Sequence, residues 1–271
     1  YAAKKGGAKL LAVRSCNAYA EENILFKGLN VVLRPLFEKL VNLKIAPSDL
    51  AAQFTFGNKA IEKNEVFFLH NAIDLNVFKF DNDIREKLKK EFQIENMTIY
   101  GHIGRFTKQK NHKFLIEIFE KICKKDKNSI LVLVGTGELD TEIKELVEKK
   151  GLDNNVIFTG VRSDIPDLLS MFDAFIFPSF YEGMPNTVIE AQAVGVHCIV
   201  ADTITRQANF TGLVKYLPLN DNADNWADEC IRVSKEHVNT HPCFIENRYT
   251  INTVVDDFVN IIFNRKFSDE N

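Results

Sequence analysis

Short apolar runs alternate with amphipathic stretches from about residue 84 onwards. Runs rich in Val, Ile and Phe are typical of buried strands, whereas apolar positions repeating every three to four residues are typical of helices. Strands are predicted at Thr98–Ile103, Ile130–Val134, Val156–Phe158, Ala174–Phe177 and Cys198–Ala201. Helices are predicted at Ile84–Phe92, Phe114–Lys124, Leu139–Lys150, Ile165–Phe172, 186–194, Trp226–Glu236 and Thr250–Phe263. This order of elements predicts an α/β fold with a parallel, doubly wound sheet.

The sequence before residue 71 contains fewer elements. It predicts strands near 9–14, at Ile45–Pro47 and at Val66–Leu69, with a helix around Leu33–Leu43 between the first two. The first seven residues are typical of a helix end followed by a turn, and a domain rarely begins on the end of a helix. We therefore expect the chain to be truncated at its amino terminus.

Composition and charge narrow the function classes. The chain has 271 residues, of which 45% are hydrophobic and 26% are charged, as in a globular protein with one large or two modest domains. Its net charge of -3 gives no reason to expect nucleic acid as a partner. The lysines of Lys87–Lys90 and Lys121–Lys127 alternate with acidic residues, which favours solvated helix faces over a basic membrane patch.

The cysteines and the hydropathy of the chain indicate which cellular compartment to expect. The five cysteines are scattered without any CxxC spacing, so neither a disulfide framework nor a zinc site is expected, and a reducing cytosol is favoured. No run of about 18 apolar residues occurs, so no transmembrane helix is predicted.

The most informative segment runs from Glu182 to Glu190. It follows an apolar run, Asp173–Ser179, that predicts a strand end, and it opens a helix with Pro185 at or near the first helical position. The free N–H groups at a helix start suit a phosphate or diphosphate. The two carboxylates suit two sets of sugar hydroxyls, so the segment predicts a sugar-nucleotide site. Taken singly, Glu182 in the loop is better explained by solvation, and Glu190 in the helix by the helix dipole.

A second candidate segment, Gly101–His112, ends a predicted strand and enters a helix. Glycines at such a corner let the backbone approach a ligand, and Arg105 and Lys110 bring positive charge to it. In a doubly wound sheet this loop lies at the same edge as residues 182–190, so its cations could neutralise a diphosphate held there. A basic surface turn is the alternative explanation.

Three other patterns give weaker evidence for a binding site or a metal site. Gly135 and Gly137 form part of a dinucleotide fingerprint, but the pattern is incomplete and a tight strand-to-helix turn explains them. Asp81 and Asp83 have the spacing of some Mg²⁺ sites, but they immediately precede a predicted helix, which favours a helix cap. The six histidines show no metal-ligand spacing on one face, so no metal site is predicted.

Several segments between His70 and Leu219 match the motifs of one known family. They are Asn71–Asp74, Gly104–Arg105, Lys110–Asn111, Val134–Glu138, Phe158–Asp164, Pro178–Ala193 and Ala201–Thr205. With these residues the chain resembles the carboxyl-terminal domain of family 4 glycosyltransferases with the GT-B fold, in particular bacterial enzymes of capsular polysaccharide and exopolysaccharide biosynthesis. The resemblance covers more than half of the chain, and the frame with two glutamates separated by seven residues is highly specific.

The resemblance implies a role for each matching residue. Glu182 would contact the donor sugar, while Arg105 and Lys110 would hold the diphosphate and stabilise charge on the leaving nucleotide. Glu190 would bind the ribose hydroxyls. The other donor-binding residues would be Gly183, Met184, Pro185, Asn186 and Thr187 at the phosphate, and Gly160, Val161 and Arg162 at the base. This family transfers the sugar with retention, and it needs neither a bound metal nor another cofactor, because the NDP-sugar is a co-substrate.

The resemblance also implies a domain organisation. Residues 1–70 would be the last part of an acceptor-side domain, residues 71–249 the donor-binding domain, and residues 250–271 a helix that crosses back to the first domain. Close relatives carry a His-Ser-His-Asn after the first-domain strand where this chain has Arg14-Ser15-Cys16-Asn17. The family's catalytic histidine is therefore not matched.

Two functions compete. The first is a retaining glycosyltransferase that moves a sugar from an NDP-sugar, with UDP favoured, to a growing surface polysaccharide or a lipid-linked saccharide. The alternative, favoured by Arg14 and Cys16, is a truncated and catalytically impaired sugar-nucleotide binding module, and a GT-B epimerase is a weaker third. A cytoplasmic location is expected, and the resemblance implies peripheral association with the inner face of the membrane.

Overall fold

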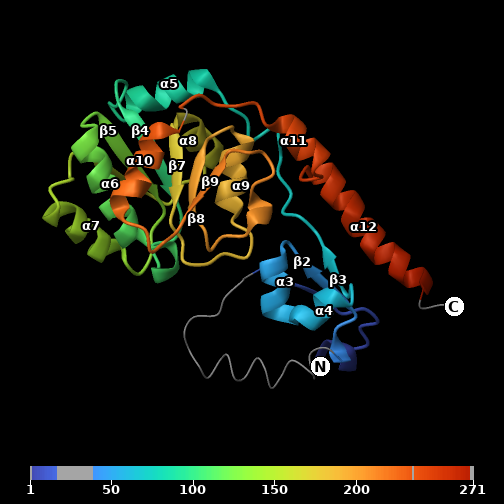
Figure 1. The fold of residues 1–271 in the computed structure, drawn as a ribbon. Coiled ribbons are helices and arrows are strands. Elements are labelled where there is room, and N and C mark those ends of the chain that lie inside the picture. The colour runs from blue at the N-terminus through green and yellow to red at the C-terminus, as the bar shows by residue number, and fades with distance from the viewer. Residues whose placement is uncertain (1, 17–38, 234, 269–271) are drawn as a thin grey trace. The chain divides into compact units, whose positions relative to one another are not determined.

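The computed structural model describes residues 2–16, 39–233 and 235–268. Contacts along the chain divide it into two units, whose elements are labelled in Figure 1. The first unit consists of Tyr1–Ala72, Glu182–Met184 and Arg248–Asn271, and the second consists of Ile73–Tyr181 and Pro185–Asn247. Each unit has a parallel sheet and hydrophobic clusters of its own.

The described part of the first unit is built on a three-stranded parallel sheet with the order β1-β2-β3. Its strands are β1 (Ala12–Arg14), β2 (Leu43–Ala46) and β3 (Val66–Phe68), and its helices are α1 (Ala2–Lys5), α3 (Asp49–Phe56), α4 (Asn58–Glu62) and α12 (Ile251–Ser268). The middle strand is buried on both faces. Ala46 packs with apolar residues of α3 and α4, whereas Leu43 and Ile45 pack with Val254 of α12.

The structure corrects several predicted boundaries in this unit. The strand expected at 9–14 begins only at Ala12. Of the helix expected at Leu33–Leu43, residues 33–38 lie outside the described residues. The helical residues that follow end at Leu40, because the amide of Leu43 joins the sheet and donates to the carbonyl of Leu11 at 3.1 Å. Helices α3 and α4 are not predicted by the apolar pattern at all.

The second unit contains a parallel sheet with the strand order β6-β5-β4-β7-β8-β9. Its strands are β4 (Thr98–Ile103), β5 (Ser129–Val134), β6 (Val156–Gly160), β7 (Ala174–Phe177), β8 (Cys198–Ala201) and β9 (Val214–Leu217). Its helices are α5 (Asn82–Glu91), η1 (Lys108–Lys110), α6 (His112–Lys125), α7 (Asp140–Lys149), α8 (Ile165–Met171), α9 (Asn186–Ala193), η2 (Arg206–Ala208), α10 (Ala223–Arg232) and α11 (His241–Glu246). The predicted doubly wound α/β sheet is confirmed, with β9 and α11 as additions.

Helices cover both faces of this sheet, which is why β5, β7 and β8 are buried at every residue. Helix α6 packs against α7 and α10, whereas α8 packs against α5 and α9. Figure 1 shows the first group at the left of this unit. No helix within the described ranges combines the length and the apolar character needed to cross a membrane.

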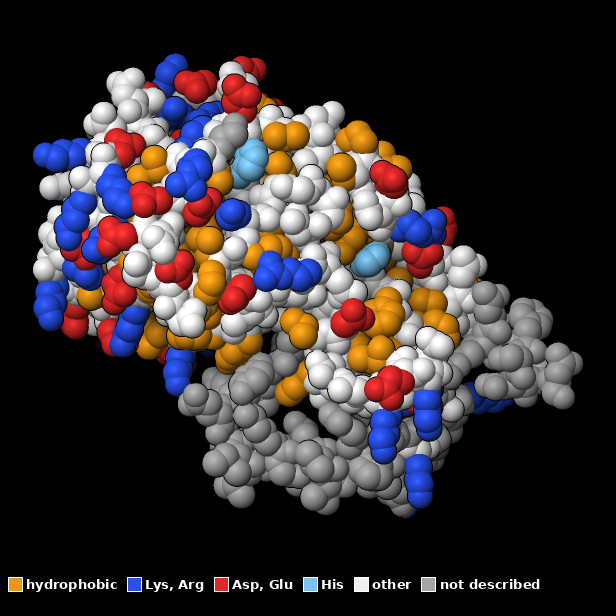
Figure 2. Space-filling model, in the orientation of Figure 1, with side chains coloured by type: hydrophobic (Ala, Val, Ile, Leu, Met, Phe, Trp, Pro, Cys, Tyr) orange, Lys and Arg blue, Asp and Glu red, His pale blue; other side chains and the backbone are white. Residues whose placement is uncertain are grey.

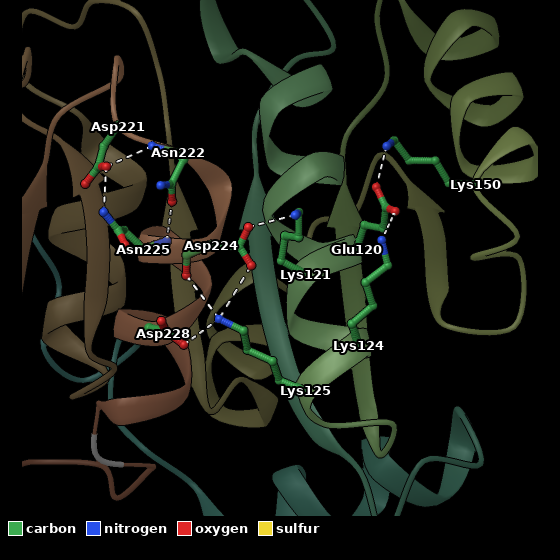
Figure 3. Close-up of polar contacts among 10 residues, drawn as sticks. All are labelled: Glu120, Lys121, Lys124, Lys125, Lys150, Asp221, Asn222, Asp224, Asn225 and Asp228. Carbon is green, nitrogen blue, oxygen red and sulfur yellow. Dashed lines mark hydrogen bonds and ion pairs between the residues drawn. The ribbon is translucent and has the colours of Figure 1, made fainter.

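Ion pairs connect α6 to its neighbours (Figure 3). Lys121 pairs with Asp224 of α10 at 2.7 Å, and Lys125 pairs with Asp228 at 2.6 Å. On the face that Figure 2 shows, Lys and Arg side chains lie interspersed with Asp and Glu over this unit. In the Lys121–Lys127 stretch, predicted to be a solvated helix face, Lys124, Lys125 and Lys127 are exposed, but Lys121 is half-buried beside α10 and the helix ends at Lys125.

Asp81 caps helix α5. Its carboxylate accepts hydrogen bonds from the amides of Asp83 and Ile84 at 3.0 and 3.1 Å. These bonds satisfy two of the N–H groups that have no partner inside the helix. The helix-cap explanation of the Asp81–Asp83 pattern is confirmed.

Candidate functional site

The strand order in the sheet of the second unit reverses between β4 and β7. From β4 the chain proceeds to β5 and β6 on one side, and from β7 it proceeds to β8 and β9 on the other. In open parallel sheets, ligands bind at such a switch point, beyond the carboxyl ends of the two strands. The residues that follow these ends are 104–111 and, within this unit, 178–181. The topology therefore brings together segments that the sequence singles out separately.

Hydrogen bonds join these two segments directly. The amide of Phe180 donates to the carbonyl of Gln109 at 2.8 Å, and the side-chain amide of Gln109 donates to the carbonyl of Tyr181 at 2.8 Å. On the other side, the hydroxyl of Thr203 beyond β8 donates to the carbonyl of Ser179 at 3.1 Å. The loop after β7 is thus held by the loops of both neighbouring strands.

Lys110 places a cation at the switch point. It is half-buried at the end of η1, and its Nζ lies 4.5 Å from the centroid of the Phe177 ring, at the last residue of β7. A Cβ on Gly104 would lie 3.3 Å from Cδ and Cε of Lys110, so the glycine leaves room for the lysine stem. Arg105, the other predicted cation, is exposed on the same loop.

Two buried histidines lie close to Lys110. The rings of His102 and His112 meet edge to face with centroids 4.8 Å apart, and Nδ1 of His102 donates to the carbonyl of Ile176 at 2.8 Å. Burial, together with the nearby charge of Lys110, lowers the pKa of both imidazoles, for His112 to about 4. Both rings are therefore neutral at neutral pH, and neither nitrogen of His112 has a hydrogen-bond partner in the described part of the chain.

Glu190 lies on α9, whose amino terminus follows the β7 loop. Pro185 precedes the helix; among the described residues no side chain caps it, and its first turn contains no acidic residue. Asn186 is exposed and Thr187 half-buried at this start. Glu190 is half-buried, and this burial raises the pKa of its carboxyl group.

No described residue supplies a hydrogen bond or an ion pair to the Glu190 carboxylate, whose raised pKa has burial as its one cause. A desolvated carboxylate is costly unless it finds donors. Sugar hydroxyl groups donate hydrogen bonds without adding charge, so they suit this position. The uncapped helix start beside it suits an anion.

Residues Glu182, Gly183 and Met184 group with the first unit. Glu182 is half-buried, whereas Gly183 and Met184 are buried. The hydroxyl of Ser48 donates to the carbonyl of Gly183, and the same side chain caps helix α3 by accepting from the amide of Ala51 at 3.3 Å. The residue that the resemblance assigns to the donor sugar thus belongs to the first unit.

The segment predicted to border the base follows β6. Gly160 has a φ of +68°, and Val161 is 77% exposed. The guanidinium of Arg162 is paired with Asp164 through Nε–Oδ1 at 2.8 Å and Nη2–Oδ2 at 2.5 Å, and this pairing lowers the pKa of Asp164. Because neighbouring strands are about 4.8 Å apart, β6 lies roughly 10 Å from β4. That separation suits a nucleoside whose diphosphate lies at the switch point.

Arg14 ends strand β1 of the first unit, where the resembling family has histidine. Its Nη2 donates to Oδ1 of Asn71 at 2.5 Å. Cys16 is exposed, with its Sγ 4.0 Å from the carbonyl oxygen of Arg14. Asn17, the last residue of this departure, lies outside the described residues.

Sequence reasoning did not identify Gln109, Thr203 or Ser48. All three act by donating hydrogen bonds to backbone carbonyls of the segment 179–183. Every residue has a carbonyl, so such contacts leave no pattern in the partner's sequence. The one available signal was the place of Gln109 directly before Lys110. In the described ranges, no group of three or more His, Cys, Asp or Glu side chains is arranged to hold a metal ion.

Comparison with known proteins gives sequence relatives. Residues 83–248 match the family described as Glycosyl transferases group 1. EpsF of Bacillus subtilis (strain 168), provisionally named a glycosyltransferase, is 36% identical over 186 residues, which cover 68% of this chain and 48% of EpsF. The UDP-Gal:alpha-D-GlcNAc-diphosphoundecaprenol alpha-1,3-galactosyltransferase of Escherichia coli is 29% identical over 228 residues, which cover 79% of this chain and 56% of that protein.

Solved structures show the same fold. HepE of Anabaena, crystallised with UDP and glucose, matches with a TM-score of 0.82 at 20% identity, covering 96% of this chain and 73% of HepE. WaaG, a glycosyltransferase involved in lipopolysaccharide biosynthesis, matches with a TM-score of 0.67 at 13% identity, covering 96% of this chain and 75% of WaaG. At these identities the likeness shows the fold alone, and it confirms the predicted α/β GT-B fold.

The chain spans about half the length of the relatives that it matches in sequence. The family match nevertheless extends over more than half of the chain, from the first turn of α5 to the second residue after α11. It contains the switch point of the sheet, Lys110 and Glu190. The chain therefore belongs to the Glycosyl transferases group 1 family.

Proposed function

We propose that the chain binds a nucleoside diphosphate sugar, with UDP as the nucleotide, and transfers the sugar with retention to a saccharide or lipid-linked acceptor of a surface polysaccharide. The observation that carries this proposal is the Glu190 carboxylate, which is desolvated and has no described partner on a helix with an uncapped start at the switch point. Family membership supports the reaction class. The name of the E. coli relative specifies UDP-Gal and a diphosphoundecaprenol-linked acceptor, and HepE was crystallised with UDP.

In the proposed reaction the bond between the anomeric carbon and the diphosphate oxygen breaks, and its electron pair leaves with the nucleotide. The acceptor hydroxyl forms the new bond to the same carbon, and its proton passes to the leaving diphosphate. Lys110 and Arg105 oppose the negative charge that develops on the diphosphate, which is the largest electrostatic contribution that these residues can make. No metal is part of this proposal, because fixed side-chain cations supply the positive charge.

The other residues bind and orient the donor. Glu190 accepts hydrogen bonds from the ribose hydroxyls, and Glu182 contacts the sugar. The backbone of residues 183–187 receives the phosphates at the start of α9, and residues 160–162 border the base. The segment 71–249 is the donor side in this proposal, and residues 1–70 and 250–271 belong to the acceptor side.

The first test is calorimetric titration of the chain with UDP, GDP and ADP, repeated on Glu190→Ala. Loss of hydrogen bonds to a charged group costs about 1.5–3 kcal/mol, so the variant should bind its nucleotide roughly 10- to 100-fold more weakly. Glu148→Ala is the matched control, because Glu148 is an exposed glutamate on α7. Failure of the unmodified chain to bind any of the three nucleotides would overturn the proposal.

Activity in the presence of a metal chelator tests the metal-free mechanism. Transfer, or hydrolysis of the donor to free sugar and UDP, should continue at an unchanged rate in excess EDTA. A rate that falls in EDTA and returns with Mg²⁺ or Mn²⁺ would contradict the assignment of the charge-stabilising role to Lys110 and Arg105.

A second candidate function is a sugar-nucleotide binding module without turnover. It is favoured by Arg14 and Cys16, which stand where the resemblance implies histidines. The two candidates differ in one observable. Binding of UDP together with release of free sugar from a UDP-sugar supports the transferase, whereas binding without any turnover supports the module.

A further inference from the structure

We propose that Gln109 is a positioning residue that sets the orientation of both Lys110 and Glu182 relative to the donor. This inference rests on the proposed function, in which Lys110 stabilises the leaving diphosphate and Glu182 contacts the sugar. Gln109 itself touches neither donor nor acceptor in this proposal. It acts through the backbone of the two residues that do.

The evidence is a pair of hydrogen bonds made by one residue. The carbonyl of Gln109 accepts from the amide of Phe180 at 2.8 Å, and its side-chain Nε2 donates to the carbonyl of Tyr181 at 2.8 Å. Both lengths lie at the short end of the range for N–H···O bonds. Two bonds to consecutive residues fix the direction of a loop segment as well as its position.

The peptide units involved explain why the effect reaches Lys110 and Glu182. The carbonyl of Gln109 belongs to the planar peptide that ends in the nitrogen of Lys110, and the carbonyl of Tyr181 belongs to the peptide that ends in the nitrogen of Glu182. Each hydrogen bond therefore fixes a peptide plane that carries one of the two residues. The two proposed functional side chains are each attached one bond beyond an anchored plane.

Hydrogen bonds of the surrounding turn fix the backbone of Gln109. It is the middle residue of η1, whose end is closed by Asn111 in a left-handed conformation with φ 55° and ψ 43°. The amide of Lys110 donates to the carbonyl of Thr107 at 3.2 Å, and the amide of Asn111 donates to that of Lys108 at 3.1 Å. Gln109 thus projects from a closed turn onto the β7 loop, which has no regular structure of its own.

Two substitutions test the side-chain bond of Gln109 alone. Gln109→Met keeps the length of the side chain but removes the donor, and Gln109→Glu places a carboxylate opposite the carbonyl of Tyr181. Both leave the backbone bond to Phe180 available. If Gln109 positions Glu182, kcat for UDP-galactose hydrolysis or transfer should fall about 10- to 100-fold in the Met variant and further in the Glu variant. The Kd for UDP alone should change less than about threefold.

A double-substitution cycle tests whether the effect passes through Glu182. We measure the ratio of the Kd for UDP to the Kd for UDP-galactose in the unmodified chain, in Gln109→Met, in Glu182→Ala and in the combined variant. Gln109→Met should lower this ratio in the unmodified background and leave it unchanged when Glu182 is already absent, because coupled residues are non-additive. A structural role alone would give the same loss in both backgrounds.

Asn155→Leu is the matched control. Its side-chain amide donates to the carbonyl of Ser129 at 2.9 Å, which is the same kind of bond, at the opposite edge of the sheet. It should lower Tm by an amount comparable to Gln109→Met without changing kcat or the Kd ratio. Equal kinetic losses in the two variants, or full activity in both Gln109 variants, would overturn the positioning role. Absence of UDP binding by the unmodified chain would instead overturn the proposed function.

Discussion

The ammonium group of Lys110 lies over the ring of Phe177, with Nζ 4.5 Å from the ring centroid. Lys110 ends η1 in the loop after β4, and Phe177 is the last residue of the adjacent strand β7, so the two residues lie on either side of the point where the strand order reverses. A cation over an aromatic face is attracted by the ring. The contact places the ammonium group beside the last residue of β7, at the edge of the sheet where the diphosphate is proposed to bind.

Replacing Lys110 by Met should lower kcat for sugar transfer by about 10²–10³-fold, the usual effect of removing one charge-stabilising group in the transition state. Lys110→Arg should retain part of the activity because it retains the charge. Steady-state kinetics with UDP-galactose measures both. Lys149→Met, at an exposed lysine of α7, is the control and should leave kcat unchanged. Equal activity of Lys110→Met and the unmodified chain would remove Lys110 from the mechanism.

Two glycines of β4 and its loop should respond differently to alanine. A Cβ on Gly104 would lie 3.0 Å from Nε2 of His102 and 3.3 Å from Cδ and Cε of Lys110, so it would push the flexible lysine stem aside. We expect Gly104→Ala to lower kcat by about tenfold while changing the free energy of unfolding by less than about 1 kcal/mol.

Gly101→Ala should act on stability instead. Its Cβ would lie 2.0 Å from the ring of Phe172, and both residues are in the core, so neither can move away. Overpacking of this kind costs about 1–3 kcal/mol or more. Urea unfolding of the two variants checks the contrast. A kinetic defect in Gly101→Ala without loss of stability would show that the two positions have been assigned the wrong way round.

The buried histidine pair predicts a dependence of stability on pH. Burial lowers the pKa of His112 from 6.5 to about 4 in the folded chain, so on acidification the unfolded chain takes up the proton first. The free energy of unfolding is therefore fully retained above about pH 6.5 and falls as the pH is lowered towards 4, by up to about 3 kcal/mol from this residue. His102 contributes in the same direction, because burial also lowers its pKa.

Urea unfolding at pH 7, 6 and 5 measures this loss. His112→Phe removes one ionisable group and keeps an aromatic ring against Phe106, with which His112 makes a ring contact at 4.2 Å. The variant should lose less stability between pH 7 and pH 5 than the unmodified chain. An identical loss in both proteins would show that His112 does not carry the effect.

The fold of the second unit was largely predictable from the sequence. The bounds of β4, β7 and β8 agree with those predicted. β7 and β8 are unbroken apolar runs, as expected for strands covered by helices on both faces. Helix α3 was missed although Ser48 and Asp49 form a start signal, because its apolar face consists mainly of alanines. Strand β9 was missed because it lies at the edge of the sheet and has an exposed Lys215 in its middle.

The candidate site was predictable only in part. The frame from Glu182 to Glu190 and the cations of the β4 loop follow from residue types and from the rule for parallel sheets. The position of Lys110 over the ring of Phe177 and the hydrogen bonds of Gln109 to the β7 loop depend on which strands are neighbours in the sheet. Strand order does not follow from the positions of strands along the chain. Nor does the pattern indicate that residues 182–184 group with the first unit, in which Ser48 donates to the carbonyl of Gly183.

Restoring the family pattern in β1 and its loop tests how far Arg14 and Cys16 limit turnover. A guanidinium stays protonated at all accessible pH values, whereas an imidazole exchanges its proton near neutrality. The double variant Arg14→His with Cys16→His should therefore hydrolyse UDP-galactose faster than the unmodified chain, by about 10²-fold if proton transfer limits the rate. Arg14→Ala with Cys16→Ala is the control, because it removes the same side chains, including the bond from Arg14 to Asn71, without adding imidazoles. A gain in both double variants would point to relief from Arg14 rather than to proton transfer. No gain in either would show that turnover is independent of these positions.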